Sequence, residues 1–203
     1  MTRRTLYRRL RARRDHITPP PGFAWPEISD GQLVMTMSPR PRHQFTAKVV
    51  SRQLDEQLPE GFWAFEATDT DDENLGKLRI PDILVCSGDA MQTDDPLDPR
   101  EIVLAVEIVS PTNPENDYDH KTRDYPAMGI PHYLILDPRD GTWTYQWGIG
   151  RGEGRPAYEN RLHLPYGKPV TVATDLGTFT VDTAGLPRYS AKDMGLTPEP
   201  EGR

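Results

Sequence analysis

Residues 102–109 read Ile-Val-Leu-Ala-Val-Glu-Ile-Val, an almost unbroken apolar run that contains one acid, Glu107. Such a run is typical of a central β-strand that is covered on both faces. A proline-rich loop ends it, residues 117–128 then show helical spacing, and residues 132–136 form a second apolar, strand-like run. This order of strand, helix and strand predicts an α/β fold in which helices flank a mixed sheet.

The residues before this stretch predict a hairpin and a helix. Residues 27–37 indicate two short strands around Asp30-Gly31, a dipeptide that favours a type I′ turn, so we expect an N-terminal β-hairpin. Apolar residues recur at helical spacing in residues 43–58, which predicts an amphipathic helix. Further strand-like segments lie at residues 63–68, 79–85 and 142–147.

The sequence predicts one folded domain between two terminal tails. Residues 1–20 hold seven arginines, all within the first 14 positions, and we expect this segment to be a basic, solvated tail. The break at Pro19-Pro20-Pro21-Gly22 puts the start of the folded domain at residue 21, and we expect the domain to span residues 21–187. Residues 148–181 suggest short strands and loops, and residues 188–203 a flexible tail.

Composition excludes several classes of protein. The 203 residues carry a formal net charge of −7, and outside the arginine-rich start 17 Lys+Arg face 31 Asp+Glu, a net of −14. Because Lys and Arg drive phosphate binding, this argues against a broad DNA-coating surface, although a local basic channel stays possible. The lone Cys86 excludes an intrachain disulfide and a cysteine-built zinc site. Neither a membrane span nor a secretory signal is recognisable, so we expect a cytoplasmic protein with no membrane partner.

Two acids within apolar strands are the main candidates for chemistry. Asp82 lies in Ile-Pro-Asp-Ile-Leu-Val at residues 80–85, and Glu107 lies in the run quoted above. A buried, unpaired carboxylate is costly, and two that converge repel each other unless a cation lies between them. A hard divalent ion with oxygen ligands solves both problems, so the pair predicts a Mg²⁺ or Mn²⁺ site. The alternative is that each acid pairs with an ordinary partner such as Arg79 or Lys121.

Lys121 could complete such a site from the predicted helix. It follows Glu107 by 14 residues, and a helix that packs back on the sheet can aim its ammonium group at the metal region. Taken alone, Lys121 is better explained as a solvated lysine that pairs with Asp117 or Asp124 on the same helix.

Several short motifs, in serial order, are similar to those of one known family. The chain resembles the Uma-two family of restriction endonucleases, within the PD-(D/E)xK nuclease superfamily, over about residues 25–147. Val109 stands where the superfamily usually has lysine, and the family resemblance implies that Lys121 replaces it from the next helix. The arginine-rich start and the residues beyond about 150 lie outside the resemblance. The motifs are Glu27-Ile28-Ser29-Asp30-Gly31-Gln32-Leu33, Met37-Ser38-Pro39, His43-Gln44, Ile80-Pro81-Asp82, Val106-Glu107-Ile108-Val109-Ser110-Pro111, Asp119-His120-Lys121, Tyr125, Gly129-Ile130-Pro131-His132-Tyr133 and Leu136-Asp137-Pro138.

The resemblance implies a restriction-endonuclease-like fold and a metal-dependent endonuclease that hydrolyses phosphodiester bonds in DNA. Asp82 and Glu107, with the backbone carbonyl of Ile108, would hold one or two Mg²⁺ ions, or Mn²⁺. Lys121 would position the attacking water or balance charge on the phosphate, and Glu27 would be a weaker third ligand or a water-positioning group. We expect His43 to cap or pack its helix, and by analogy with nucleases that cut both strands we expect a homodimer.

Two alternatives are compatible with the same residues. The first is a catalytically inactive nuclease fold that binds nucleic acid or a protein partner, which the acidic body and Val109 both favour. The second keeps the mechanism but acts on RNA or branched DNA. Binding of Mg²⁺ or Mn²⁺ that depends on Asp82 and Glu107 separates the first alternative from an active nuclease.

Overall fold

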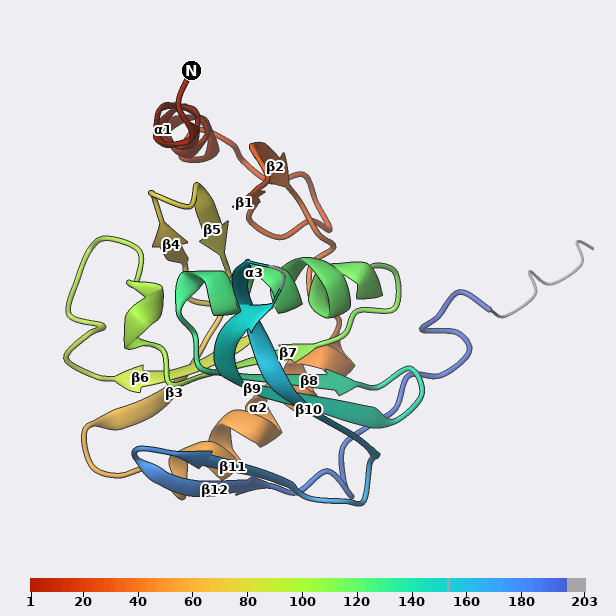
Figure 1. The fold of residues 1–203 in the computed structure, drawn as a ribbon. Helices are drawn as coiled ribbons and strands as arrows, with labels where there is room; N and C mark the ends of the chain where they lie inside the picture. The colour runs from red at the N-terminus through yellow and green to blue at the C-terminus, as the bar shows by residue number, and fades with distance from the viewer. Residues whose placement is uncertain (153, 197–203) are drawn as a thin grey trace, which may run out of the picture.

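The centre of the molecule is a six-stranded sheet with the strand order β10-β9-β8-β7-β6-β3 (Figure 1), in a computed structural model that describes residues 1–152 and 154–196. Strands β7 and β8 run parallel, and the other neighbouring pairs of this sheet are antiparallel. The sheet is therefore mixed, as the sequence predicts. The strands are β3 (Phe62–Glu66), β6 (Ile83–Ser87), β7 (Leu104–Ile108), β8 (His132–Asp137), β9 (Thr142–Gly152) and β10 (Arg155–Pro165).

Helices cover both faces of this sheet, which confirms the predicted α/β fold. Val50 and Leu54 of α2 belong to the core on one face, which the hairpin β11–β12 extends. Tyr125 and Met128 of α3 belong to the core on the other face. Because side chains alternate along a strand, Glu107 of β7 points to the α3 face. The covering elements are α2 (Pro41–Asp55), α3 (Thr122–Met128), β11 (Val170–Thr174) and β12 (Gly177–Val181).

A second sheet, with the order β2-β1-β5-β4, lies beside the first and contains the predicted hairpin. Strands β1 and β2 pair antiparallel around Asp30 and Gly31, whose φ angles of 50° and 75° suit a type I′ turn. Glycine tolerates this conformation freely, and Asp30 is one of the residue types that adopt it most readily. The strands are β1 (Glu27–Ser29), β2 (Gln32–Val34), β4 (Thr70–Asp72) and β5 (Lys77–Arg79).

The strand-like segment at residues 79–85 is the junction between the two sheets. Strand β5 ends at Arg79 and β6 begins at Ile83, so Ile80-Pro81-Asp82 connects them. Pro81 has no N–H to donate to a strand ladder, which explains why the pairing stops here. Asp82 therefore lies on a link that leads into β6, an inner strand of the central sheet, next to the C-terminal end of β7.

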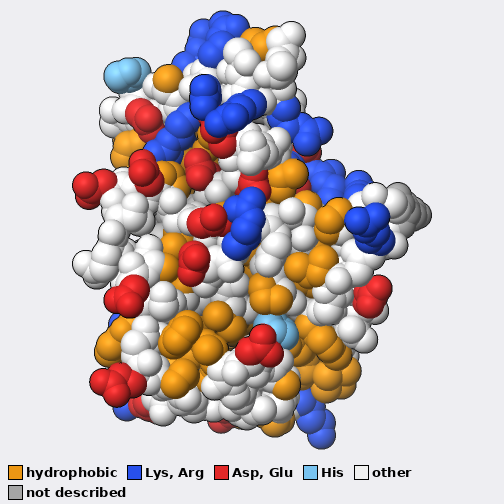
Figure 2. All heavy atoms as spheres, turned by 60° about the vertical axis from the view of Figure 1, so that its left-hand side comes forward, with side chains coloured by type: hydrophobic (Ala, Val, Ile, Leu, Met, Phe, Trp, Pro, Cys, Tyr) orange, Lys and Arg blue, Asp and Glu red, His pale blue; other side chains and the backbone are white. Residues whose placement is uncertain are grey.

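The basic N-terminal segment is a docked helix, so the expectation of a solvated tail is wrong. Helix α1 (Arg3–Arg14) buries Tyr7 against Ile28 and Leu78. Figure 2 shows its blue side chains at the top of the molecule with red side chains close beneath them. Arg4 and Arg8 pair with Glu73, which directly follows β4. These ion pairs between segments far apart in the chain accompany the buried packing of Tyr7.

The chain after β8 also differs from expectation. Strands β9 and β10 are 11 residues each and form a long hairpin, where short strands and loops are expected beyond residue 148. Part of the expected flexible C-terminal tail is packed, because Tyr189 is buried and its backbone N–H donates to the carbonyl of Pro138. Residues 197–203 of that tail lie outside the described residues. Among the helices that the structure describes, none is long and apolar enough to cross a membrane.

Two further helical segments, η1 and η2, precede and follow β7 in the chain. A short 3-10 turn, η1 (Pro99–Glu101), precedes β7, and a π-helix, η2 (Asn116–Lys121), runs directly into α3. The segment between β7 and β8 thus begins with the loop at residues 109–113 and a π-helix before it becomes α-helical. Pro126 lies inside α3, which remains helical to Met128 and ends at Gly129 in the left-handed conformation.

Candidate active site

Asp82, Glu107 and Lys121 line one cavity, although they come from three separate elements. Asp82 lies on the link before β6, Glu107 is on β7, and Lys121 is the last residue of η2. The cavity has a volume of about 630 Å³. Its other polar lining residues include Glu27, Ser38, Arg40, His43, Asp69, Ser110, Thr112, Asn113, Asn116, Asp117 and Tyr189.

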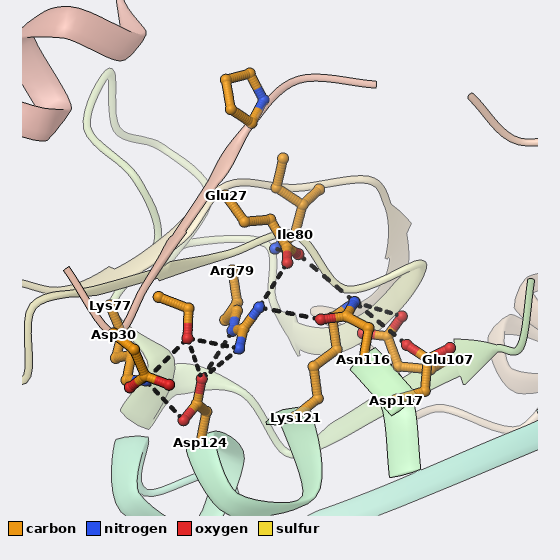
Figure 3. Close-up of polar contacts among 12 residues, drawn as sticks. Glu27, Asp30, Lys77, Arg79, Ile80, Glu107, Asn116, Asp117, Lys121 and Asp124 are labelled. Carbon is orange, nitrogen blue, oxygen red and sulfur yellow. Dashed lines mark hydrogen bonds and ion pairs between the residues drawn. The ribbon is translucent and has the colours of Figure 1, made fainter. Parts of the chain in front are cut away.

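The ammonium group of Lys121 lies among three carboxylates (Figure 3). Its Nζ is 2.8 Å from Oε2 of Glu107, 3.5 Å from Oε1 of Glu27 and 3.8 Å from Oδ1 of Asp117. All four side chains are buried. Tyr125 of α3 donates its hydroxyl to the other oxygen of Glu107. The lysine is therefore not the solvated surface residue that the sequence suggests when Lys121 is considered alone.

Asp82 is held by groups on the other side of the cavity. Its Oδ2 accepts the backbone N–H of Ile108 at 2.8 Å, and its Oδ1 lies 3.1 Å from Nε2 of His43. The contact with Ile108 joins the link to the end of β7. Asp82 is partly exposed, whereas Glu107 is only 1% exposed. His43, expected to cap or pack helix α2, is buried at the start of that helix but bonds to Asp82 instead of the helix backbone.

Glu27 connects the cavity to a buried ion network. Its Oε2 accepts from Nη1 of Arg79 at 2.7 Å, and its Oε1 accepts the backbone N–H of Ile80 at 2.9 Å. Arg79 reaches in turn to Asp124, which also pairs with Lys77. Figure 3 shows this chain of contacts from Lys77 to the Lys121 cluster. Both Glu27 oxygens are thus engaged, so its observed role is to hold the hairpin, the link and η2 together.

Burial and crowded negative charge raise the pKa values of Asp117 and Glu107. Burial raises the pKa of Asp117 to about 7, with the charges of Asp82 and Glu27 adding to the effect against the opposing Lys121. Burial also raises the pKa of Glu107 well above its ordinary value, despite Lys121. These two groups therefore retain protons at a pH at which ordinary carboxyl groups are ionised.

Asp82 and Glu27 differ from this pair, because nearby cations lower their pKa values. Burial alone would raise the pKa of Asp82, but the charge and hydrogen bond of His43 bring it below the usual value. Lys121 and Arg79 similarly outweigh the burial of Glu27 and lower its pKa. Burial would lower the pKa of His43, yet Asp82 raises it. The pKa values of the acids in this cavity are thus shifted in opposite directions.

The π-helix η2 brings Asp117 and Lys121 to the same cavity. In a π turn the backbone hydrogen bonds join residues five apart instead of four. The backbone carbonyl of Asp117 also accepts hydrogen bonds from the hydroxyls of Tyr133 at 2.8 Å and Thr122 at 3.2 Å. Short π segments inside α-helices are frequent at functional sites. Here the segment immediately precedes α3, so the packing of α3 on the sheet fixes the position of Lys121.

The donor chemistry of the cavity fits a hard divalent cation. Three carboxyl groups surround the Lys121 ammonium, and the Asp82 and Glu107 side chains with the Ile108 carbonyl offer oxygen donors of the kind that Mg²⁺ and Mn²⁺ prefer. Within residues 1–152 and 154–196, no group of three or more His, Cys, Asp or Glu side chains is arranged to hold a metal. Metal binding would therefore require Glu107 to exchange its contact with Lys121 for one with the ion.

Asp117 and Arg79 have larger roles in this arrangement than the sequence indicates. Asp117 appears in the sequence only as an i, i+4 partner of Lys121, and the structure shows both side chains buried at the cavity. Arg79 appears only as a possible partner of an acid, and it connects Glu27 to Asp124. The i, i+4 spacing was a usable signal for Asp117. No local pattern marks Arg79, because its partners come from distant segments.

A mixed sheet flanked by helices, with acids and a lysine at the end of its central strands, defines a restriction-endonuclease-like fold. The chain belongs to the Uma2 family, whose model, described as "Putative restriction endonuclease", matches residues 19–183. The match extends beyond the sequence resemblance to include β10 to β12, and it begins after α1. A similar solved structure is that of "a putative nuclease belonging to DUF820" from Anabaena variabilis. It has 16% sequence identity and a TM-score of 0.55, and the alignment covers 88% of this chain and 93% of the other. No curated protein matches the chain.

Proposed function

We propose that the protein is a Mg²⁺- or Mn²⁺-dependent endonuclease that hydrolyses phosphodiester bonds in DNA. One observation carries the proposal: Asp82, Glu107 and Lys121, far apart in the chain, line the same cavity at the end of the central strands. The family description and the nuclease-like fold support the same class of activity.

The proposed roles follow from the contacts of each side chain. Asp82 and Glu107, with the carbonyl of Ile108, hold the ion, which when bound lowers the pKa of a water molecule and stabilises charge on the phosphate. Lys121, released from Glu107, donates to the attacking water or to a nonbridging phosphate oxygen. Glu27 keeps Lys121 in place through its contact with the ammonium group. His43 orients Asp82 through the 3.1 Å contact.

The decisive experiment is cleavage of plasmid DNA and of single-stranded DNA, with and without Mn²⁺, by the wild-type protein and by Asp82→Ala. Asp82→Ala is expected to abolish metal-dependent cleavage and to leave the circular dichroism spectrum unchanged, because Asp82 lies on a link at the cavity. Asp119→Ala, which removes an exposed acid from η2, is the matched control and should cleave like the wild type. Equal cleavage by wild type and Asp82→Ala would reject the assignment.

A binding module built on the same fold is the second candidate. It is favoured by the ion pair that already neutralises Glu107 and by the lack, among the described residues, of a ready group of three metal-binding side chains. Calorimetric titration with Mn²⁺ separates the two functions. Binding that is lost in both Asp82→Ala and Glu107→Gln supports the nuclease, whereas the absence of such binding in the wild type supports the module.

We further propose a homodimer as the active form, by analogy with nucleases that cut both strands of a duplex. Analytical ultracentrifugation, with and without a DNA duplex, tests this proposal. A single species with the mass of one chain under both conditions would contradict it.

A further inference from the structure

An exposed apolar wall lines one side of the candidate active-site cavity. It consists of Phe23, Trp25 and Met37, which are 40%, 52% and 52% exposed. Large apolar side chains at a surface are unremarkable singly, but here three of them line the cavity that contains Asp82 and Glu107. Neither the proposed hydrolysis nor the sequence motifs account for the two aromatic rings.

The wall is held in a fixed position by the backbone. Phe23 and Met37 form an antiparallel bridge, the N–H of Ala24 donates to the carbonyl of Thr36 at 2.9 Å, and the N–H of Ser38 donates to the carbonyl of Gly22 at 2.8 Å. Phe23 and Trp25 are two residues apart, and both line the cavity. A rigid surface of this kind loses little conformational freedom when a ligand binds.

Trp25 is also held by a buried arginine. The guanidinium of Arg14 lies 5.9 Å from the centre of the Trp25 ring, and Arg14 itself is fixed by an ion pair with Asp69 at 2.7 Å and by the carbonyl of Pro26. A cation next to one ring face stabilises the ring without covering it fully, since half of Trp25 remains exposed. The arginine-rich helix α1 therefore supports one wall of the cavity.

We propose that Phe23 and Trp25 stack against an unpaired nucleobase, so that the substrate is a nucleic acid with a single-stranded or unpaired segment at the cleavage point. This inference depends on the proposed function, because it concerns the substrate of the same cavity. In a continuous duplex both faces of every base are covered by neighbouring bases, whereas an unpaired base offers a free face to an aromatic ring. Stacking on aromatic side chains is the usual way in which proteins bind single strands irrespective of sequence.

A cation at the cavity suits the phosphate next to such a base. Arg40 lines the same cavity with an exposed side chain, and none of the ion pairs among the described residues involves it; its Nη1 donates to the carbonyl of Asp193. The apolar wall would contact one base and Arg40 its phosphate. Such a site does not need the broad basic surface that binding of a duplex requires. The acidic composition of the chain is consistent with this smaller footprint.

The test measures binding separately from cleavage. Fluorescence anisotropy in Ca²⁺ compares a labelled 20-nucleotide single strand with a duplex of the same sequence, and a gel confirms that both stay intact. Trp25→Ala and Phe23→Ala should each weaken binding of the single strand by about tenfold, in the range for loss of one stacked base. Trp25→Phe should restore most of the affinity. Trp63→Ala, which removes a ring that is 54% exposed and does not line the cavity, should bind like the wild type.

Tryptophan fluorescence gives a second readout that a structural role would not change. Bound single strand should quench the emission of the wild type, and Trp25→Phe should lose that part of the quenching while it still binds. The inference is overturned if Trp25→Ala binds the single strand as tightly as the wild type, or if single strand and duplex lose affinity equally. It is also overturned if Trp25→Ala only converts a dimer to a monomer, since the wall would then be a protein interface.

The outcomes also distinguish failure of the inference from failure of the proposed function. If Trp25→Ala loses single-strand binding and the wild type does not cleave, base stacking on the apolar wall is supported and the nuclease activity is rejected. If cleavage depends on Asp82 but binding does not depend on Trp25, the nuclease activity is supported and base stacking on the apolar wall is rejected.

Discussion

At the scale of single residues, the Glu107–Lys121 pair dominates the chemistry of the cavity. Both groups are buried, and each would be strongly unfavourable there without the other. In this structure Lys121 occupies the Glu107 oxygen that a metal ion would need. Metal binding and the ion pair therefore compete for the same carboxylate. This competition leads to a measurable consequence for Lys121.

Replacing Lys121 with Met should destabilise the metal-free protein by about 3–5 kcal/mol, because the buried Glu107 carboxylate loses its partner. Added Mn²⁺ should then raise the thermal midpoint of Lys121→Met more than that of the wild type, because the ion takes the place of the ammonium group. Differential scanning fluorimetry in EDTA and in Mn²⁺ measures both effects. Lys48→Met, which removes an exposed lysine of α2, is the control; equal Mn²⁺ shifts in all three proteins would contradict the proposed exchange.

Asp117 predicts how stability depends on pH. Its pKa of about 7 in the folded protein lies above the ordinary value of 3.8, so the folded state binds the extra proton. That contribution to the free energy of unfolding is complete below about pH 4 and is lost as the pH rises to about 7, at up to about 1.4 kcal/mol per pH unit. Urea denaturation in EDTA at pH 5, 6 and 7 should show this decline, and Asp117→Asn should reduce it. A decline of the same slope in Asp117→Asn would show that another group is responsible.

At the scale of elements, the π-helix η2 sets the geometry of the site. The π segment carries both Asp117 and Lys121, four residues apart, and both side chains line the cavity. The hydroxyls of Tyr133 and Thr122 bind the displaced carbonyl of Asp117. The segment is thus supported by β8 and α3 rather than by its own sequence.

Deleting Asp119, an exposed residue of η2, shortens the spacing between Asp117 and Lys121 from four residues to three, and should displace one of the two side chains from the cavity. Cleavage should fall by about 100-fold or more, since small misplacements of catalytic groups have effects of this size. Circular dichroism should remain that of a folded α/β protein. The substitution Asp119→Ala keeps the register and should keep activity; a deletion variant that cleaves normally would show that the π geometry is unimportant.

At the scale of the whole molecule, helix α1 connects the N-terminus to the second sheet and supports the aromatic wall. The family match begins at residue 19, so α1 lies outside it. Its ion pairs with Glu73 are exposed and contribute little in water, whereas Tyr7 is buried and donates to Asp71. Apolar burial, rather than charge, should therefore keep the helix docked.

Limited digestion with trypsin tests this because α1 contains seven arginines. The wild type should be cut slowly within residues 3–14, and Tyr7→Ala, which removes about 3 kcal/mol of packing, should be cut rapidly there. Glu73→Gln should be cut at nearly the wild-type rate. Rapid cleavage of the wild type within α1 would show that the helix is not docked in solution.

Much of the fold was accessible from local sequence patterns. The hairpin at Asp30-Gly31, the helix now seen as α2 and the apolar strands β7 and β8 were all predicted, because turn chemistry and hydrophobic periodicity act over a few residues. The docking of α1 and the length of β9 and β10 were missed. Helix α1 is docked through Tyr7, whose neighbours Ile28 and Leu78 belong to distant segments, and the long hairpin depends on pairing between two segments that are mostly polar.

The sequence by itself determined the hairpin, the helix α2 and the strands β7 and β8, the mixed α/β class and the family resemblance, since each depends on local spacing and on motifs in series. The tertiary structure alone decided that Asp82, Glu107 and Lys121 line one cavity, that Asp117 and His43 lie with them, and that two exposed rings form its wall. The physical reason is that a side chain's burial, partner and pKa depend on groups brought near it by folding, and those groups come from segments that no local pattern connects.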